Sequence, residues 1–341
     1  TSSSFVTFFP FVVFVAALSS LTFTLSTFVW FAPTFIPDQL ITNTQKIFKG
    51  QNEELDVAVL NKTKQRLWYI YDKREKIGGR FYSNDIERLQ AVLFSSDGWA
   101  IVYAPNYQKG LEKYWEAVDY QGISYKIEKV FVDSLSNLAY VKFSGDGFSF
   151  ISFANWNEIF PAQTVWEISS NRRERHILEK PVKVTEEKSY FIWQPQFFYQ
   201  LLVSSESGNL IINSNGEMIG ILDKNRNIIY GWMIDSQFAS ILQKGATNYT
   251  AALWKGRMAH GFVKESDFIK RVSGFYVDSS PTRATASTVG AGDLIIRIQN
   301  RSVEAEDLSR QILSAPEKFS VTILRGGKEL NLEAIKTNIS K

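Results

Sequence analysis

Short apolar runs separated by turn residues recur through the middle of the chain. They cover residues 67–71, 91–94, 100–103, 127–132, 138–143, 165–168, 210–212, 218–222 and 229–234. Runs of this length, rich in β-branched and aromatic residues and bounded by Gly, Asp, Asn or Ser, predict β-strands, and many such strands predict a sandwich or a barrel. Residues 213–216 predict a hairpin turn, and residues 238–244, followed by Gly245, predict a short helix.

The N-terminal segment predicts a different element. Residues 1–37 contain no charged residue, and residues 11–31 are rich in Phe, Val, Ala and Leu. A helix of about 20 such residues spans the hydrocarbon core of a bilayer. We therefore expect a transmembrane helix within residues 1–37, followed by a polar linker at 38–56. A cleavable signal peptide is the alternative, but no basic segment precedes the apolar run and no small-residue cleavage site follows it.

Composition excludes several classes of protein. Apolar residues make up 45% of the chain and charged residues 21%, which is typical of a globular protein. The 38 Lys and Arg residues are interleaved with 35 Asp and Glu residues, so no nucleic-acid partner is expected. There is no cysteine and there are only two histidines, so neither a metal site nor a cofactor is expected.

Three sequence segments carry a more specific signal. Residues 95–105 read SSDGWAIVYAP, residues 136–142 read SNLAYVK, and residues 207–221 read SGNLIINSNGEMIGI. In this order they resemble the triad-bearing segments of trypsin-like serine proteases of the HtrA/Deg family. The resemblance implies a trypsin-like double β-barrel at residues 57–246, opening with a strand within residues 61–71.

The same resemblance places unusual residues at the catalytic positions. Pro105 stands at the histidine position, Asn137 at the aspartate position, and the serine is retained as Ser207. Proline offers no proton acceptor and asparagine carries no charge, whereas a triad needs a base and a group that orients it. The turn before the serine is Ser205-Glu206-Ser207, without the family's glycine. The sequence therefore predicts an inactive homologue rather than an enzyme.

A second family resemblance covers the end of the chain. Residues 273–277 read SGFYV, residues 291–298 read AGDLIIRI, and residues 321–328 read VTILRGGK. These motifs resemble a PDZ domain at residues 249–338, which implies binding of an extended peptide as an added strand. The implied peptide-binding residues are Ala252, Leu253 and Trp254 of the carboxylate loop, and Leu308 and Ile312 of a helix at 305–314.

Three other features have alternative explanations. His176 lies in a charged stretch that predicts a solvated loop, with an anionic partner site as the alternative. His260 lies among small and apolar residues and is expected to be structural. The aromatic run at 190–199, in which Tyr199 replaces an expected Asp, predicts core strands, or else a docking face at the cleft.

The sequence thus predicts a mainly β, single-pass membrane protein. Its expected function is that of an HtrA-like pseudoprotease acting as a scaffold, adaptor or accessory subunit of a membrane complex. The alternatives are an active membrane-anchored serine protease with a non-standard base at Ser207, and a PDZ-based peptide sensor. Expected partners are membrane proteins or C-terminal peptides, together with the lipid bilayer. The resemblance implies extracytoplasmic soluble domains, on the periplasmic side if bacterial, and either a homotrimer or a subunit of a hetero-complex.

Overall fold

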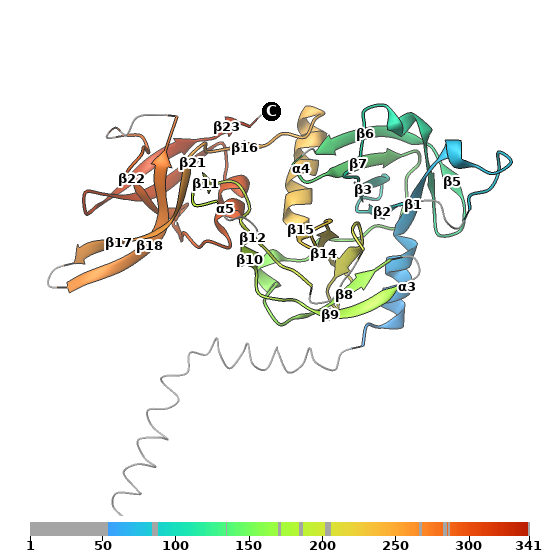
Figure 1. Cartoon of the computed structure of the whole chain (residues 1–341), viewed down its shortest axis with the longest axis horizontal. Helices are drawn as coiled ribbons and strands as arrows, with labels where there is room; N and C mark the ends of the chain where they lie inside the picture. The colour runs from blue at the N-terminus through green and yellow to red at the C-terminus, as the bar shows by residue number, and fades with distance from the viewer. Residues whose placement is uncertain are drawn as a thin grey trace, which may run out of the picture. The chain divides into compact units, whose positions relative to one another are not determined.

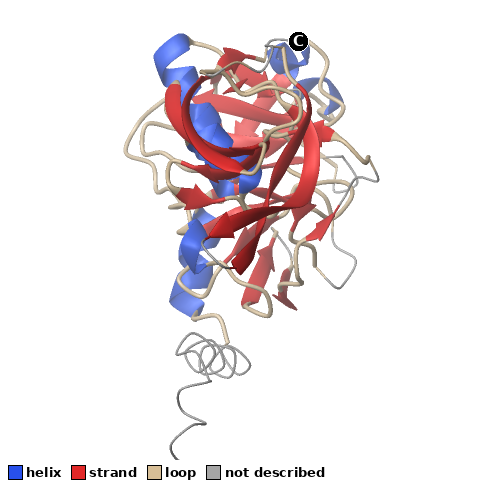
Figure 2. Ribbon diagram, turned by 90° about the vertical axis from the view of Figure 1, so that its left-hand side faces the viewer, coloured by secondary structure: helices blue, strands red, loops and turns tan. Residues whose placement is uncertain are grey.

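The computed structural model describes residues 54–83, 88–133, 135–169, 172–183, 187–201, 206–265, 268–281, 285 and 287–339 (Figure 1). The predicted membrane helix at 1–37 lies outside these residues, as does most of the predicted linker. Among the described residues, no helix is long and apolar enough to cross a bilayer. Strands form most of the regular structure (Figure 2), which confirms the prediction of a mainly β chain.

The first sheet has seven strands in the order β5-β4-β1-β2-β3-β7-β6. Their bounds are β1 Leu67–Asp72, β2 Leu89–Leu93, β3 Trp99–Tyr103, β4 Trp115–Val118, β5 Ser124–Tyr125, β6 Ile127–Asp133 and β7 Leu138–Phe143. Every residue of β3 is buried. Alternate residues of β3 face two different clusters: Ala100 and Val102 contact one, and Ile101 contacts the other. The sheet therefore has apolar packing on both faces, as the curved wall of a barrel does.

The second sheet has five strands in the order β15-β14-β13-β8-β9. Their bounds are β8 Thr164–Ile168, β9 Arg173–Ile177, β13 Leu210–Ile212, β14 Met218–Leu222 and β15 Ile228–Tyr230. A two-stranded sheet of β10 (Val182–Lys183) and β12 (Phe197–Phe198) accompanies it. The bridges Leu178↔Leu201 and Gln200↔Asn227 connect these pieces. The two sheets are barrel-like, consistent with the predicted trypsin-like fold.

A shared apolar cluster joins the two barrel-like sheets. It includes Ile101 and Tyr140 from the first sheet, Leu210 and Ile212 from the second, and Ile234 from helix α4 (Gly231–Lys244). The phenol of Tyr140 is buried and donates a hydrogen bond to the Ile234 carbonyl at 3.1 Å. Helix α4 thus packs on both sheets and fixes their mutual position.

Two sequence expectations about helices were wrong. Residues 57–65, assigned partly to an opening strand, form helix α3 (Val57–Gln65), because the Asp56 carboxylate accepts a hydrogen bond from Ala58 N at 2.8 Å and caps it. Residues 229–234, expected as one strand, end β15 and begin α4 at Gly231. The buried positions Met233, Gln237 and Ile241 follow a helical period that a short apolar run conceals.

The C-terminal sheet has the order β11-β17-β18-β19-β21-β22, with β20 paired to β19. Its bounds are β11 Tyr190–Phe191, β17 Lys255–Glu265, β18 Phe268–Ser279, β19 Leu294–Ile298, β20 Arg301–Ser302, β21 Lys318–Arg325 and β22 Lys328–Ile335. Helix α5 (Leu308–Ser314) packs on one face. Strands β16 (Thr250–Ala251) and β23 (Thr337–Asn338) pair separately. Three 3-10 turns, Lys73–Glu75, Leu111–Tyr114 and Trp156–Glu158, complete the regular structure among the described residues.

Candidate functional site

Ser207 and Pro105 line the same cavity, of about 290 Å³. Its walls come from β1, β2, the end of β3 and the segment after it. The side chains that line it include Tyr71, Asp72, Arg88, Gln90, Tyr103, Asn106, Tyr107 and Trp115. No histidine is among the described residues of this lining. The cavity therefore offers aromatic faces and hydrogen-bonding groups beside the Ser207 hydroxyl.

The turn that carries Ser207 is held by two hydrogen bonds of Gly208. Gly208 N donates to the Leu222 carbonyl at 2.8 Å, and Gln90 Nε2 lies 3.5 Å from the Gly208 carbonyl. Gly208 has φ of 88°, in the left-handed region that favours glycine. Ser207 and Glu206 are exposed, while Ser205 lies outside the described residues. Ser207 is thus a solvent-exposed residue of the cavity lining.

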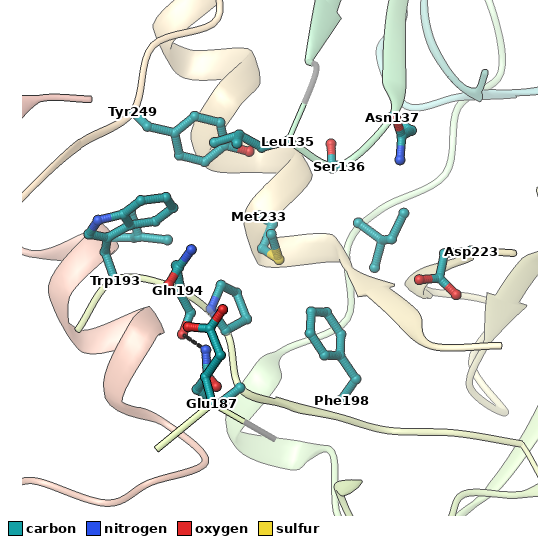
Figure 3. Close-up of a pocket in the computed structure, with 14 residues that line it drawn as sticks. Leu135, Ser136, Asn137, Glu187, Trp193, Gln194, Phe198, Asp223, Met233 and Tyr249 are labelled. Carbon is teal, nitrogen blue, oxygen red and sulfur yellow. Dashed lines mark hydrogen bonds between the residues drawn. The ribbon is translucent and has the colours of Figure 1, made fainter. Parts of the chain in front are cut away.

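Asn137 lies next to the same segment but lines another cavity. Its carbonyl accepts a hydrogen bond from Ala104 N at 2.8 Å, immediately before Pro105. Its side chain lines a cavity of about 300 Å³, which Figure 3 shows among residues of several segments, including Met233, Trp193 and Tyr249. The structure therefore brings all three predicted catalytic positions into one neighbourhood, with two of them on one cavity and the third on another.

A buried carboxylate anchors the segment that carries Asn137. Asp133 is 2% exposed. It accepts hydrogen bonds from Ser136 Oγ at 2.5 Å, from Leu135 N at 3.0 Å and from the Tyr249 hydroxyl at 2.5 Å. Burial and the adjacent Asp133 raise the pKa of Tyr249 well above its ordinary value, so this phenol stays protonated and keeps donating. The loop before β7 is therefore tied to the residue that leads into the C-terminal sheet.

The edge of the C-terminal sheet is occupied by a strand from the middle of the chain. In β11, Tyr190 pairs with Gly256 and Phe191 with Lys255, antiparallel to β17. Ile192 N then donates to the Trp254 carbonyl at 2.9 Å. An extended segment paired in this way makes the same backbone hydrogen bonds as a peptide added to a sheet edge. The start of the aromatic run at 190–199 thus supplies an internal strand to the C-terminal sheet, whereas its end, Phe198 and Tyr199, packs in the core of the second barrel-like sheet as predicted.

The predicted peptide-binding residues surround this internal strand. Ala252, Trp254, Leu308 and Ile312 are buried in the cluster that also contains Tyr190, Ile192 and Trp193, while Leu253 is half-buried. The Tyr190 ring lies 5.6 Å from that of Phe275, centroid to centroid. The structure therefore brings the five residues into one region, next to a strand of the same chain. Their role in binding a separate peptide stays a prediction.

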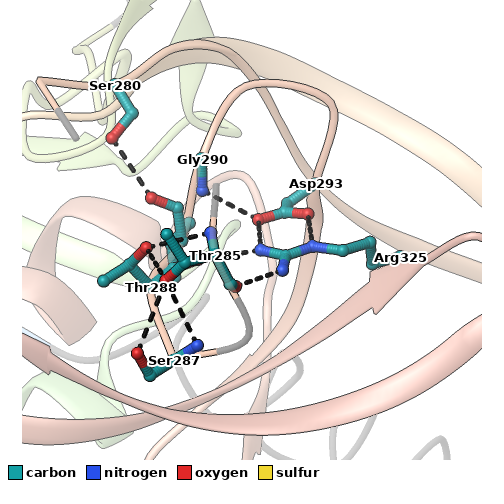
Figure 4. Close-up of polar contacts among 8 residues, drawn as sticks. Ser280, Thr285, Ser287, Thr288, Gly290, Asp293 and Arg325 are labelled. Carbon is teal, nitrogen blue, oxygen red and sulfur yellow. Dashed lines mark hydrogen bonds and ion pairs between the residues drawn. The ribbon is translucent and has the colours of Figure 1, made fainter. Parts of the chain in front are cut away.

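The AGD and RGG motifs meet in one polar cluster. The Arg325 guanidinium donates to both carboxylate oxygens of Asp293, at 2.6 and 2.7 Å, and also to the carbonyls of Thr285 and Thr288 (Figure 4). Gly290 N donates to Asp293 at 2.8 Å. Asp293 is 1% exposed, so these contacts satisfy a carboxylate that water does not reach. The motifs therefore hold a loop rather than form a ligand site.

One of the two histidines departs from expectation. His176 was predicted in a solvated loop, which is wrong, because it lies on β9 and is buried, with Nε2 3.1 Å from Glu167 Oε2. His260 is exposed on β17, and its Nδ1 lies 3.0 Å from Ser273 Oγ. The alternation of charged residues concealed the burial of His176, since its neighbours on the other face of β9 are solvated.

Comparison with known proteins gives a clear result for the fold. No protein-family model matches the chain, and no curated protein sequence matches it. Solved structures do match. The HtrA-type protease AlgW with a decapeptide covers 83% of this chain and 98% of its own, at 14% identity and a TM-score of 0.52. The same protease with a tripeptide covers 83% and 97%, at 13% identity and a TM-score of 0.54. The chain therefore shares the fold of HtrA-type serine proteases.

This result corrects one prediction. The substitutions at Pro105 and Asn137 led to the expectation that the chain is not an enzyme. That expectation was wrong as a conclusion about the class of protein, because the solved structures that share the fold are proteases studied with bound peptides. Pro105 and Asn137 are differences from the HtrA/Deg motif. These differences alone do not establish that the chain lacks enzyme activity.

Proposed function

We propose that this protein is an HtrA-like, membrane-anchored protein that binds polypeptides in the cavity beside Ser207, as a scaffold or accessory subunit of a membrane complex. The observation that carries the proposal is the cavity itself: it is open, and aromatic and hydrogen-bonding side chains line it. Such a lining suits an extended chain, since aromatic faces bind apolar side chains and amide or guanidinium groups bind peptide carbonyls. The uncharged segment at 1–37 would supply the anchor.

Partners and location follow from the same proposal. An anchor at the N-terminus would keep the cavity near the bilayer, so membrane proteins and their exposed segments are the expected partners. The extracytoplasmic side is proposed from the HtrA-like fold. Assembly as a homotrimer or as a subunit of a hetero-complex is part of the proposal and is resolved by the size of the native complex.

The test is a pull-down of the full chain from native membranes in mild detergent, with mass and composition measured. Ser207→Trp would fill the cavity, and Ser320→Trp is the matched control, because Ser320 is exposed on β21 of the C-terminal sheet. We expect partners to be lost from Ser207→Trp and kept by Ser320→Trp. Equal recovery of the same partners by both variants would refute binding at this cavity.

Proteolysis at Ser207 is the second candidate. The specific observation that favours it is the exposed Ser207 in the cavity lining, within a fold shared with proteases. A serine needs a neighbouring base to react, and the described lining offers no histidine for that role. Labelling by a fluorophosphonate probe, absent in Ser207→Ala, would establish an activated serine. Absence of labelling together with intact partner binding would argue against proteolysis at Ser207 and support binding as the function.

A further inference from the structure

Two carboxylates and an imidazole converge between β8 and β9, and none of the three lines the Ser207 cavity. Glu167 on β8 pairs with Glu174 on β9, and Val165 pairs with His176. Because side chains alternate along a strand, Glu174 and His176 project to the same face as Glu167. His176 Nε2 lies 3.1 Å from Glu167 Oε2 and 3.7 Å from Glu174 Oε2. The three candidate donor atoms lie within 4.8 Å of one another.

These groups are buried to a degree that requires compensation. The side chains of Glu167 and His176 are each 2% exposed, and that of Glu174 is 28% exposed. Buried carboxylates are stable only when paired or bound to a cation. Arg172 lies 2.5 Å from the other oxygen of Glu174, and it is 48% exposed. Among the described residues, neither ring nitrogen of His176 makes a hydrogen bond of acceptable geometry. The buried imidazole therefore points its Nε2 at two carboxylate oxygens.

The geometry points to a zinc ion bound by Glu167, Glu174 and His176. Zinc binds imidazole nitrogen and carboxylate oxygen at about 2.0–2.2 Å in a tetrahedron, which sets neighbouring donors about 3.3 Å apart. The two measured separations, 3.1 and 3.7 Å, lie on either side of that value. Three protein donors leave one position of the tetrahedron for water or another small ligand.

A contact behind Glu167 fits the same assignment. Asn209 Nδ2 donates to Glu167 Oε1 at 2.5 Å, so it holds the carboxylate with its other oxygen toward His176. Asn209 is itself buried at the start of β13. Partners of this kind orient ligands in metal sites. An imidazole among the donors favours zinc over calcium or magnesium, which prefer oxygen alone. The ion would link β8 to β9 and bring positive charge between the two carboxylates.

The test measures zinc bound by the full chain, purified in mild detergent with a histidine-free tag. The chain is dialysed against buffered zinc, and metal content is measured by mass spectrometry, with affinity from competition with a chromophoric chelator. We expect about one zinc per chain, and at least about tenfold weaker binding in His176→Gln and Glu174→Gln. His260→Gln is the matched control, because His260 is the other histidine of the chain, and it should bind as the unaltered chain does.

Two further measurements keep the test decisive if His176→Gln fails to fold. Asn209→Ala retains all three ligands and should weaken zinc by about 10–100-fold. Added zinc should raise the Tm of the unaltered chain and of His260→Gln, and raise it less in Asn209→Ala and Glu174→Gln. The assignment is overturned if the unaltered chain retains no zinc, or if Glu174→Gln and Asn209→Ala bind it unchanged. The cluster would then be a polar contact between His176 and the two carboxylates, without a metal.

Discussion

At the residue scale, the guanidinium of Arg325 makes several hydrogen bonds at once. It makes paired hydrogen bonds to Asp293 and also donates to the backbone carbonyls of Thr285 and Thr288. We expect Arg325→Ala to lower the free energy of unfolding by about 2 kcal/mol, since hydrogen bonds to a buried charge are lost. Arg325→Lys should recover only part of this, because an ammonium cannot make the paired contact. Chemical denaturation measures both.

A surface ion pair on the same sheet supplies the control for Arg325. Arg297 lies 3.0 Å from Glu329, with both side chains at least one-third exposed. Arg297→Ala should change the free energy of unfolding by less than about 1 kcal/mol. If Arg297→Ala and Arg325→Ala lower the free energy of unfolding equally, the burial of Asp293 does not strengthen the contact between Arg325 and Asp293.

Glu116 predicts a specific response to acid. Burial alone would raise its pKa, but Lys76 above all, with the hydroxyls of Ser124 and Tyr82, lowers it to about 2 from an ordinary value of 4.5. A depressed pKa stabilises the fold above the unfolded-state pKa, and that contribution fades as pH falls through the folded-state pKa. The stability difference between the unaltered chain and Glu116→Gln should therefore shrink between about pH 4.5 and pH 2.

Denaturant melts across this pH range measure the Glu116 effect. Glu329→Gln is the control, because Glu329 is about one-third exposed and pairs only at the surface. A Glu116→Gln difference that stays constant from pH 5 to pH 2 would contradict the assigned network of Lys76, Ser124 and Tyr82.

Strand β11 carries the prediction that belongs to the element scale. Tyr190 is 4% exposed and packs in the core of the C-terminal sheet, although it lies far from that sheet in sequence. Tyr190→Ala should cost about 3 kcal/mol of unfolding free energy, because an aromatic side chain is removed from a packed core. Tyr120→Ala, at a residue that is 52% exposed, should cost less than about 0.5 kcal/mol. Equal losses would mean that β11 is only loosely attached.

Individual strands were largely predictable from sequence. Residues 138–143, 210–212 and 218–222 form β7, β13 and β14 with those bounds, because each is a short apolar run between turn residues. The start of α4 was missed because Ile228 to Ile234 is a continuous apolar run. Such a run is compatible with a buried strand as well as with a helix. The pairing of β11 with β17 was also missed. Pairing partners depend on long-range packing, and a two-residue strand leaves no periodic pattern to read.

The candidate site was predictable in part. Motif order placed Pro105, Asn137 and Ser207 near one another, and the structure brings their segments together. The cavity walls from β1 and β2 were not foreseen, because residues such as Tyr71, Arg88 and Gln90 belong to no motif. The buried group at Glu167 and His176 was hidden for another reason. Charged residues normally indicate a solvated strand, but His176 on β9 and Glu167 on β8 are buried.

At the scale of the whole described structure, the C-terminal sheet and the barrel-like sheets are predicted to depend on each other. Removal of residues 247–341 would strip the partners of Tyr190, Ile192 and Trp193, which are buried against that sheet. It would also remove Tyr249 from Asp133. We expect the truncated chain to bind a dye for exposed apolar surface and to self-associate, as measured by fluorescence and light scattering.

A chain with Tyr190, Ile192 and Trp193 changed to Ser provides the control for the truncation. In the truncated form these substitutions should reduce dye binding, since they remove the uncovered apolar side chains. In the full chain the same substitutions should destabilise the C-terminal sheet. A truncated chain that stays monomeric and binds no dye would show that the barrel-like sheets fold independently.

The path of β11 has a consequence for synthesis on the ribosome. The strand is made about sixty residues before β17, its partner in the sheet. At about 5–20 residues per second, the segment waits on the order of several seconds before its partner has been translated. During that interval an aromatic sheet edge is unpaired in the nascent chain. Strand β11 therefore cannot complete its pairing when it is synthesised, and its unpaired backbone is open to a chaperone until β17 has been translated.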